Sequence, residues 1–188
     1  YGKLCDFGLA ACLKDSSDRA YTVCGTRGYM APEVGSKAGY TVAVDWWCLG
    51  ILLFELMVGE GPFSGQDYDA LQAMKFQGIT SVHSAHQGSD WMDLVSGLCQ
   101  YLPEQRLPML PGGVDRVKSH NWYEGFDWAG HRAQKMTPPH LPRVENREDL
   151  RNFDTSWINR PEEISYVSDG TGWDKNFGEE ISVLPVSA

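Results

Sequence analysis

Four carboxylates stand in sequence contexts that could support chemistry. Asp6 opens the triplet Asp-Phe-Gly, and Glu33 closes the nonapeptide GTRGYMAPE. Asp45 and Glu55 lie within the apolar segment 41–58. A carboxylate in apolar surroundings must find hydrogen-bond donors or a cation, and an arginine guanidinium supplies paired donors. The two carboxylates of the apolar segment therefore need partners, whereas the triplet taken alone is also typical of a turn after a strand.

A small set of elements must position these carboxylates. Residues 1–5 resemble a short β-strand, and residues 6–40 are rich in Gly, Ser, Thr and Pro without a sustained hydrophobic period, which predicts a long ordered loop. The segment 41–58 is apolar on almost all sides, so we expect a helix enclosed by protein on every side. Thr41 is a suitable N-cap for this helix, and residues 59–62 would end it.

Three further helices are predicted, at 67–76, 89–101 and 114–122. The second would begin at Ser89 and bury an apolar stripe at helical spacing, formed by Trp91, Leu94, Val95 and Leu98. Beyond Tyr123, prolines and dispersed aromatic and charged residues indicate an extended segment that gains order by lying on another surface. The predicted fold class is mainly α.

Composition limits the classes of function. The chain has 188 residues, of which 42% are hydrophobic, and can form one sizeable core. Its net charge of -9 disfavours nucleic acid and anionic membranes and favours basic peptides. Five scattered cysteines fit neither a zinc site nor a disulfide scaffold, which predicts a reducing, cytoplasmic location. The longest apolar run is shorter than the roughly 20 residues that span a bilayer, so no membrane span is expected.

The motifs resemble those of the protein kinase family in their order and spacing. Asp6, Phe7 and Gly8 precede the nonapeptide at a distance suited to an activation segment, here 6–33. Asp45, Trp47 and Gly50 are similar to the DxWxxG pattern at the start of the buried central kinase helix. Arg106 is similar to the arginine that pairs with the final glutamate of the nonapeptide, here Glu33.

This resemblance implies a partial protein kinase-like fold. Residues 1–122 would form the C-terminal lobe from the Asp-Phe-Gly motif onward, with a central helix over about 41–58. The N-terminal lobe of the kinase fold is missing from this chain and would be a partner of it. Residues 123–188 would form an extended C-terminal tail.

The kinase resemblance also implies roles for the first motif. Asp6 would hold the Mg²⁺ ion that bridges the phosphates of ATP, Phe7 would pack as a position switch, and Gly8 would let the backbone turn. Asp45 would brace the backbone of the catalytic loop. ATP and Mg²⁺ are therefore the expected cofactors.

Within the protein kinases, the chain resembles the AGC group of serine/threonine kinases, most of all the cGMP-dependent kinases and next the cAMP-dependent kinases. The clues are YTVCGT at 21–26, NWYEGFDW at 121–128 and GWDKNF at 172–177. The resemblance implies that Thr22 is a regulatory phosphorylation site. It also implies cyclic-nucleotide-binding domains upstream of the chain.

Two parts of the tail receive roles from the same resemblance. Asn152, Phe153 and Asp154 are similar to the element that passes over the nucleotide pocket, where Phe153 would touch the adenine. Trp173 and Phe177 would dock in a groove on the small lobe.

Four residues would bind substrate or act next to it. Thr26 is similar to the threonine that hydrogen-bonds the catalytic base and selects serine or threonine. Arg27 and Met30 belong to the loop that receives the peptide. Glu55 is similar to the acid that binds an arginine two residues before the phosphoacceptor, although a structural glutamate with a protein partner would explain it too.

The chain departs from the AGC pattern in the peptide loop and the activation segment. Arg27 and Gly28 replace Pro and Glu, which makes substrate preference less certain than the activity class. Ala11 replaces a basic residue that helps to hold the loop phosphate, and Lys14 or Arg19 could compensate.

The sequence lacks a Gly-rich phosphate loop, a VAIK lysine and its partner glutamate, and an HRD segment. We therefore expect these residues alone to be inactive, as the C-terminal part of a cyclic-nucleotide-dependent kinase acting on basic peptides. The alternative is a noncatalytic interaction module derived from a kinase, or a truncated gene product. In the isolated chain, apolar side chains such as Phe7, Phe153 and Phe177 would be exposed and would invite aggregation or partners.

Overall fold

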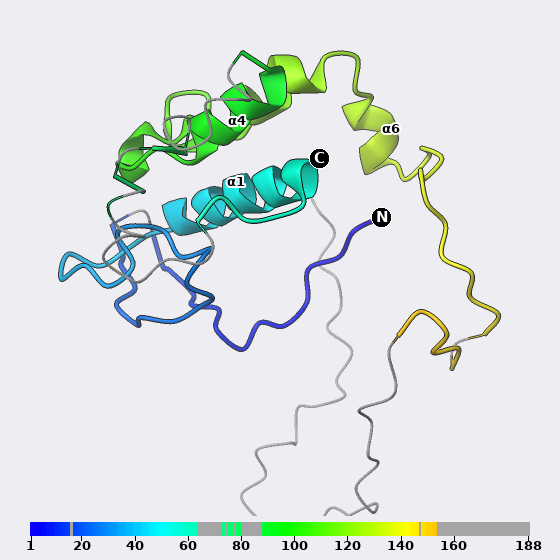
Figure 1. Ribbon diagram of the computed structural model, residues 1–188, viewed down its shortest axis with the longest axis horizontal. Coiled ribbons are helices and arrows are strands. Elements are labelled where there is room, and N and C mark those ends of the chain that lie inside the picture. Colours follow the sequence, from blue (N-terminus) through cyan, green and yellow to red (C-terminus); the bar gives the residue numbers. More distant parts are fainter. Residues whose placement is uncertain are drawn as a thin grey trace, which may run out of the picture. The chain divides into compact units, whose positions relative to one another are not determined.

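The computed structural model describes residues 1–15, 17–63, 73, 75–76, 78–79, 88–146 and 148–153 (Figure 1). Its α-helices in chain order are α1 (Ala43–Val58), α4 (Asp90–Leu98), α5 (Asp115–Lys118) and α6 (Trp128–Arg132). Short 3₁₀ turns lie at Pro103–Gln105, Leu107–Met109 and Asn121–Tyr123. The predicted mainly α class is confirmed for the described residues.

The chain divides into two compact units, Tyr1–Thr137 and Pro138–Ala188. All of the helices named above lie in the first unit. The predicted boundary between a lobe and a tail after residue 122 remains a prediction.

Helix α1 is the central element of the first unit. Its buried side chains include Trp47, Ile51 and Phe54, which recur at the three- and four-residue spacing of one helical face. The helix ends as the sequence predicts, because Gly59 takes the left-handed conformation and its N–H donates to the carbonyl of Glu55 at 2.8 Å. At the other end Val42 is the N-cap without a side-chain bond, while the Thr41 hydroxyl accepts from the Ala43 N–H at 3.3 Å.

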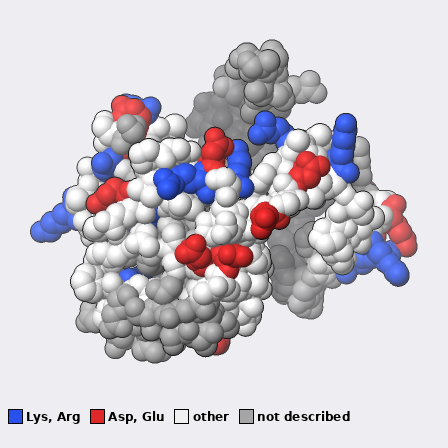
Figure 2. All heavy atoms as spheres, turned by 90° about the horizontal axis from the view of Figure 1, so that it is seen from above, with Lys and Arg blue, Asp and Glu red and all other residues white. Residues whose placement is uncertain are grey.

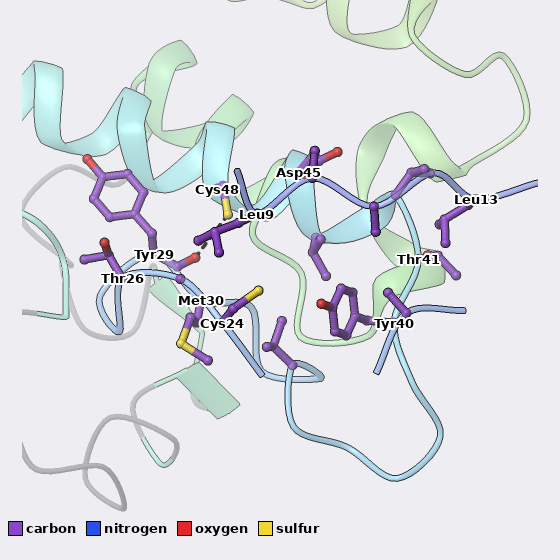
Figure 3. A pocket seen from close by; sticks show the side chains of 17 residues that line it. Leu9, Leu13, Cys24, Thr26, Tyr29, Met30, Tyr40, Thr41, Asp45 and Cys48 are labelled. Atoms are coloured by element: carbon purple, nitrogen blue, oxygen red, sulfur yellow. Dashed lines mark hydrogen bonds between the residues drawn. The ribbon is translucent and has the colours of Figure 1, made fainter. Parts of the chain in front are cut away.

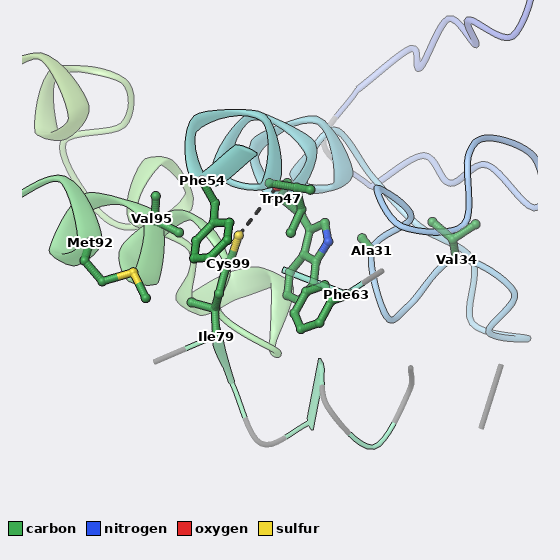
Figure 4. Close-up of a cluster of buried hydrophobic side chains, with 10 residues drawn as sticks. Ala31, Val34, Trp47, Phe54, Phe63, Ile79, Met92, Val95 and Cys99 are labelled. Atoms are coloured by element: carbon green, nitrogen blue, oxygen red, sulfur yellow. Dashed lines mark hydrogen bonds between the residues drawn. The ribbon is translucent and has the colours of Figure 1, made fainter. Parts of the chain in front are cut away.

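Helix α4 packs against α1 at close range. A Cβ atom added at Gly50 would overlap the Cys99 sulfur and lie 3.0 Å from Leu98 Cβ. Glycine is therefore required where the two helices cross. Figure 4 shows Met92 and Val95 of α4 together with Phe54 and Trp47 of α1 in the resulting core.

Three predictions about the elements need correction. Residues 1–5 form no strand: all five are exposed, and no described residue pairs with them in a sheet, which a strand needs. Helix α1 is not enclosed on every side, since Leu49, Leu52 and Leu56 are exposed on one face among the described residues. The helix expected over 114–122 is shorter: α5 spans four residues and the 3₁₀ turn Asn121–Tyr123 follows it.

Of the other two predicted helices, one is present and one is only partly described. The helix expected over 89–101 is present as α4 and is shorter, spanning Asp90–Leu98. The one expected over 67–76 lies mostly outside the described residues. Ala73, Lys75 and Phe76 of it are described, and all three are helical.

Candidate functional site

The end of the loop that precedes α1 is held by a buried ion pair. Arg106 donates to Glu33 through both terminal nitrogens, at 2.6 Å to Oε1 and 2.7 Å to Oε2. Its remaining donors reach the carbonyls of Ala43 at 2.8 Å and Gln100 at 3.1 Å. The Arg106 guanidinium carbon also lies 5.3 Å from the centroid of the Trp47 ring. One side chain thus ties the loop to the start of α1 and to the chain after α4.

Trp47 is the core residue next to this pair. Its ring stacks on Phe63, with ring centroids 6.0 Å apart and planes 11° apart. Its carbonyl accepts from the Cys99 thiol at 3.6 Å. The structure therefore places Trp47 and Gly50 of the predicted motif where they join α1 to its neighbours.

A tight turn follows Gly25. The Thr26 carbonyl accepts from the N–H groups of both Tyr29 and Met30, at 2.9 and 3.0 Å. Ala31, directly after the turn, is buried. The side chains of Thr26 and Arg27 are exposed, so the turn presents them outward. Thr26 is the residue predicted to bond the catalytic base, and Arg27 is one of those predicted to receive the peptide.

Glu55 and Tyr29 form a second link between the loop and α1. The Tyr29 hydroxyl donates a short hydrogen bond to Glu55 Oε2, and this bond raises the pKa of Tyr29 above its usual value of 10.0. The Cys48 thiol donates to the Tyr29 carbonyl at 3.3 Å. Glu55 is thus half-buried with a protein donor, as the structural alternative requires. No partner of its other oxygen, Oε1, is found among the described residues.

A cavity of about 350 Å³ lies between the loop and the start of α1 (Figure 3). Thr26, Met30, Asp45 and Cys48 line it. Withdrawal of Asp45 from water beside this cavity raises the pKa of its carboxyl above 3.8. No hydrogen bond to the Asp45 carboxylate is found within the described part of the chain. The expected donors for this carboxylate are therefore not provided by the described residues.

An isolated antiparallel bridge joins the middle of the loop to its last residue. Ala20 and Tyr40 exchange N–H···O bonds of 2.9 Å in both directions, and the Tyr40 hydroxyl donates to the Thr22 carbonyl at 2.6 Å. Gly39 has a φ of 73°, and a Cβ there would lie 2.8 Å from the Tyr21 ring. Thr22 is exposed, so its side chain is accessible for modification.

Asp6, Phe7 and Gly8 stand apart from this arrangement. All three are exposed, and none of them lines the cavity. Asp6 has a φ of 61°, which is uncommon for a residue other than glycine, and its Oδ1 accepts from the Gly8 N–H at 3.4 Å. Strained backbone of this kind clusters at functional sites.

The tail residues are only partly described. Phe153 lies in the second unit and is exposed, in a short turn in which its N–H donates to the Leu150 carbonyl at 2.9 Å. Asn152 donates to the Arg143 carbonyl at 2.9 Å in the same unit. Asp154, Trp173 and Phe177 lie outside the described residues.

Two residues of the site escaped the sequence interpretation. Tyr29 is part of the nonapeptide. The available signal was that a carboxylate in an apolar helix needs a hydrogen-bond donor, and a tyrosine hydroxyl is such a donor. Lys75 is buried under the turn, and its Nζ donates to the Met30 carbonyl at 2.7 Å. A lysine within the helix predicted at 67–76 carries no sequence signal for such a position.

The described residues were also searched for ion sites and membrane segments. Within the described ranges, no group of three or more His, Cys, Asp or Glu side chains is arranged to hold a metal ion. In the same residues, no helix combines the length and the apolar character that crossing a bilayer would need. On the face shown in Figure 2, acidic and basic side chains are interspersed.

The family model described as the protein kinase domain matches residues 2–123. The chain belongs to the protein kinase family, and the resemblance predicted from the motifs is confirmed. The described residues, whose regular secondary structure is helical apart from an isolated β-bridge, carry part of this fold.

Similar proteins include cGMP-dependent protein kinases. The chain is 37% identical to the cGMP-dependent protein kinase egl-4 of Caenorhabditis elegans over 94% of this chain and 22% of the relative. It is 36% identical to the cGMP-dependent protein kinase isozyme 1 of Drosophila melanogaster, over 94% of this chain and 23% of the relative. The chain is also 38% identical to a cAMP-dependent protein kinase of C. elegans described as catalytic subunit-like. This match covers 81% of this chain and 37% of the relative. The chain thus spans less than a quarter of the length of these cGMP-dependent relatives.

Proposed function

We propose that the chain is the C-terminal part of a serine/threonine kinase that transfers the γ-phosphate of ATP to basic peptides under the control of cGMP. The observation that supports this most is the loop from Gly25 to Glu33, which is tied down at its end and in its middle. Arg106 holds Glu33 at the end of the loop, and Glu55 holds Tyr29 in its middle. A loop fixed in this way can present a peptide to a phosphate donor with little further ordering.

Each site residue has a role in this function. Thr26 lies beside the catalytic base of the complete domain, and Arg27 and Met30 contact the residues next to the phosphoacceptor. Glu55 keeps Oε2 on Tyr29 and offers Oε1 to a substrate arginine.

ATP and Mg²⁺ are the cofactors of the complete domain. The Asp6 carboxylate is exposed and supplies the hard oxygen ligand that Mg²⁺ prefers. Bound Mg²⁺ would neutralise charge on the transferring phosphate. Phe153 would cover the adenine, and Trp173 and Phe177 would attach the tail to the N-terminal lobe.

Two features of the proposal concern control and location. Phosphate on Thr22 would add negative charge and acceptor oxygens, which can order a loop when basic residues converge on it. Cyclic-nucleotide-binding domains in the same protein would make transfer depend on cGMP, and the protein would act in the cytoplasm. The 188 residues alone would be inactive, because a single metal ligand does not assemble the transfer site.

A transfer assay with the full-length protein that carries this chain tests the function. The assay measures phosphate transferred from labelled ATP to a peptide with arginine two residues before serine, with and without cGMP. The control peptide has alanine in place of that arginine. We expect cGMP-stimulated transfer, a preference of about tenfold or more for the arginine peptide, and loss of transfer in Asp6→Asn.

The alternative, a noncatalytic interaction module, has support from Arg27 and Gly28, which depart from the AGC pattern in the peptide loop. It predicts no transfer by the full-length protein with either peptide. If the full-length protein transferred phosphate to both peptides at equal rates, the kinase activity would be supported. The proposed binding of a substrate arginine by Glu55 would be contradicted.

A further inference from the structure

Lys75 is a buried cation with an unusual set of partners. Among the described residues, the charged side chains that are buried are Arg106 and Lys75, and Lys75 is only 2% exposed. Arg106 is matched by the carboxylate of Glu33. For Lys75, no ion pair with an acidic side chain is found in the described part of the chain. A buried ammonium without a carboxylate must be satisfied by other acceptors.

Backbone carbonyls of the peptide loop provide these acceptors. Lys75 Nζ donates to the Met30 carbonyl at 2.7 Å and, in a longer bond, to the Arg27 carbonyl at 3.4 Å. Burial lowers the pKa of Lys75 from 10.5, while the nearby Cys48 and Glu33 act in the opposite direction. An ammonium group has three donors and a compact charge, so it can hold two carbonyls that point to one place.

The two carbonyls belong to the tight turn that begins at Thr26. Inside the turn, the N–H groups of Tyr29 and Met30 both donate to the Thr26 carbonyl. Lys75 binds the opposite polar groups of the same segment, the carbonyls that the turn itself leaves unpaired. The N–H groups of the turn therefore bond within the turn, and its carbonyls bond to the lysine. Thr26 and Arg27 remain exposed.

We propose that Lys75 is a positioning residue that fixes the peptide-binding turn, so that Thr26 lies beside the catalytic base and Arg27 meets a residue next to the phosphoacceptor. This role rests on the proposed kinase function. Lys75 touches neither the peptide nor ATP and acts only through the backbone of residues 27 and 30. A buried ammonium lowers stability relative to an apolar side chain of the same length, so its benefit lies in the geometry of the turn.

Hydrogen exchange in the chain itself tests the clamp without any need for activity. In Lys75→Met, which keeps the length of the side chain and removes the donors, we expect the Tyr29 and Met30 amides to exchange about tenfold faster. Amides in α1 and α4 should exchange at the wild-type rate. Lys118→Met, which removes a half-buried lysine from α5, is the matched control and should leave the turn unchanged. Equal exchange of the turn in Lys75→Met and wild type would overturn the clamp.

A second variant covers the case in which Lys75→Met exchanges faster throughout the chain. Lys75→Gln keeps one donating group and should show a smaller increase, confined to the turn. An increase confined to residues 26–31 in this variant supports the clamp. A uniform increase over all helices shows general destabilisation and contradicts it.

Kinetics of the full-length protein then separates positioning from a structural role. Lys75→Met should raise the KM for peptide about fivefold to tenfold and leave the KM for ATP within about twofold. Lys75→Gln should restore part of the peptide KM. A purely structural role would lower kcat through the fraction of folded enzyme and leave both KM values unchanged. If the wild-type protein transfers no phosphate while the exchange result holds, the kinase function fails and the clamp stands.

Discussion

The two ends of the loop before α1 differ in how many contacts hold them. Residues 25–33 are joined to the rest of the first unit by the Glu33–Arg106 pair, the Tyr29–Glu55 bond and the Lys75 ammonium. Residues 1–10 are exposed along their whole length. Both stretches carry kinase motifs, so the presence of a motif does not by itself decide how far its residues are buried. The contacts of a few polar side chains distinguish the two stretches.

The largest expected effect is the loss of Arg106, which anchors the ordered end. Arg106→Met should lower the free energy of unfolding by about 3–5 kcal/mol, because it leaves the Glu33 carboxylate buried without a cation. Urea denaturation of the chain measures this. Arg116→Met, which removes an exposed arginine from α5, should change stability by less than about 0.5 kcal/mol. If the two variants lost the same small amount, the ion pair would not be what anchors the loop.

A double variant sharpens this result. Arg106→Met combined with Glu33→Gln removes both charges, so it should be more stable than Arg106→Met alone. A double variant that is less stable by the sum of the two single losses would show that the two side chains act independently.

Gly50→Ala is the next largest effect, because it tests the crossing of α4 with α1, the helix that carries Glu55. The added methyl group overlaps Cys99 and Leu98 in the core, and such overpacking costs about 1–3 kcal/mol. Gly97→Ala in α4 is a matched control, because its Cβ would meet Leu107 only at an ordinary 3.5 Å. Since alanine favours helix over glycine, Gly97→Ala should stabilise by up to about 1 kcal/mol. Changes of the same sign in the two variants would argue against the close crossing.

A smaller effect concerns the carboxylate beside the cavity. The pKa of Asp45 is higher in the folded chain than its unfolded value of 3.8, because burial disfavours its charge. The favourable contribution of the protonated acid is therefore present below pH 3.8 and is lost as the pH rises through the folded pKa. Asp45→Asn should thus raise the urea midpoint at neutral pH, and this gain should shrink as the pH falls toward 3.8.

Glu104→Gln removes an exposed carboxylate from another part of the chain and controls for the loss of a negative charge. A gain for Asp45→Asn that stays constant between neutral pH and pH 3.8 would contradict the burial explanation.

The elements that sequence predicts well are those whose pattern and partners are local. The existence of a helix over the apolar segment 41–58 and its stop at Gly59 follow from the local run of apolar residues and from the left-handed conformation that glycine adopts easily. The pairing of Glu33 with Arg106, which the kinase resemblance predicted, is also present. The predicted roles of the site residues in catalysis and binding remain predictions.

What sequence reasoning missed depends on contacts between distant segments. A strand at residues 1–5 needs a neighbouring strand, and none is found among the described residues. The exposed leucines of α1 follow the same rule, since an apolar residue is buried only where another segment covers it. Lys75 illustrates the opposite case, because a residue type typical of surfaces is buried by a fold that supplies it with carbonyls.

The smallest effect belongs to the exposed end of the loop. Phe7 is 70% exposed, so Phe7→Ser should change the free energy of unfolding by less than about 0.5 kcal/mol. It should also reduce the binding of a dye that reports apolar surface, because Phe7 lies near the exposed Leu4 and Leu9 in the sequence.

Phe54 of α1 is the matched control at the other extreme of burial. It is 0% exposed, and Phe54→Ala should cost about 3–5 kcal/mol because it leaves a cavity in the core. A cost near 3 kcal/mol for Phe7→Ser would instead mean that Phe7 packs against the chain in solution. The first motif would then be as firmly held as the second, and the contrast between the two ends of the loop would disappear.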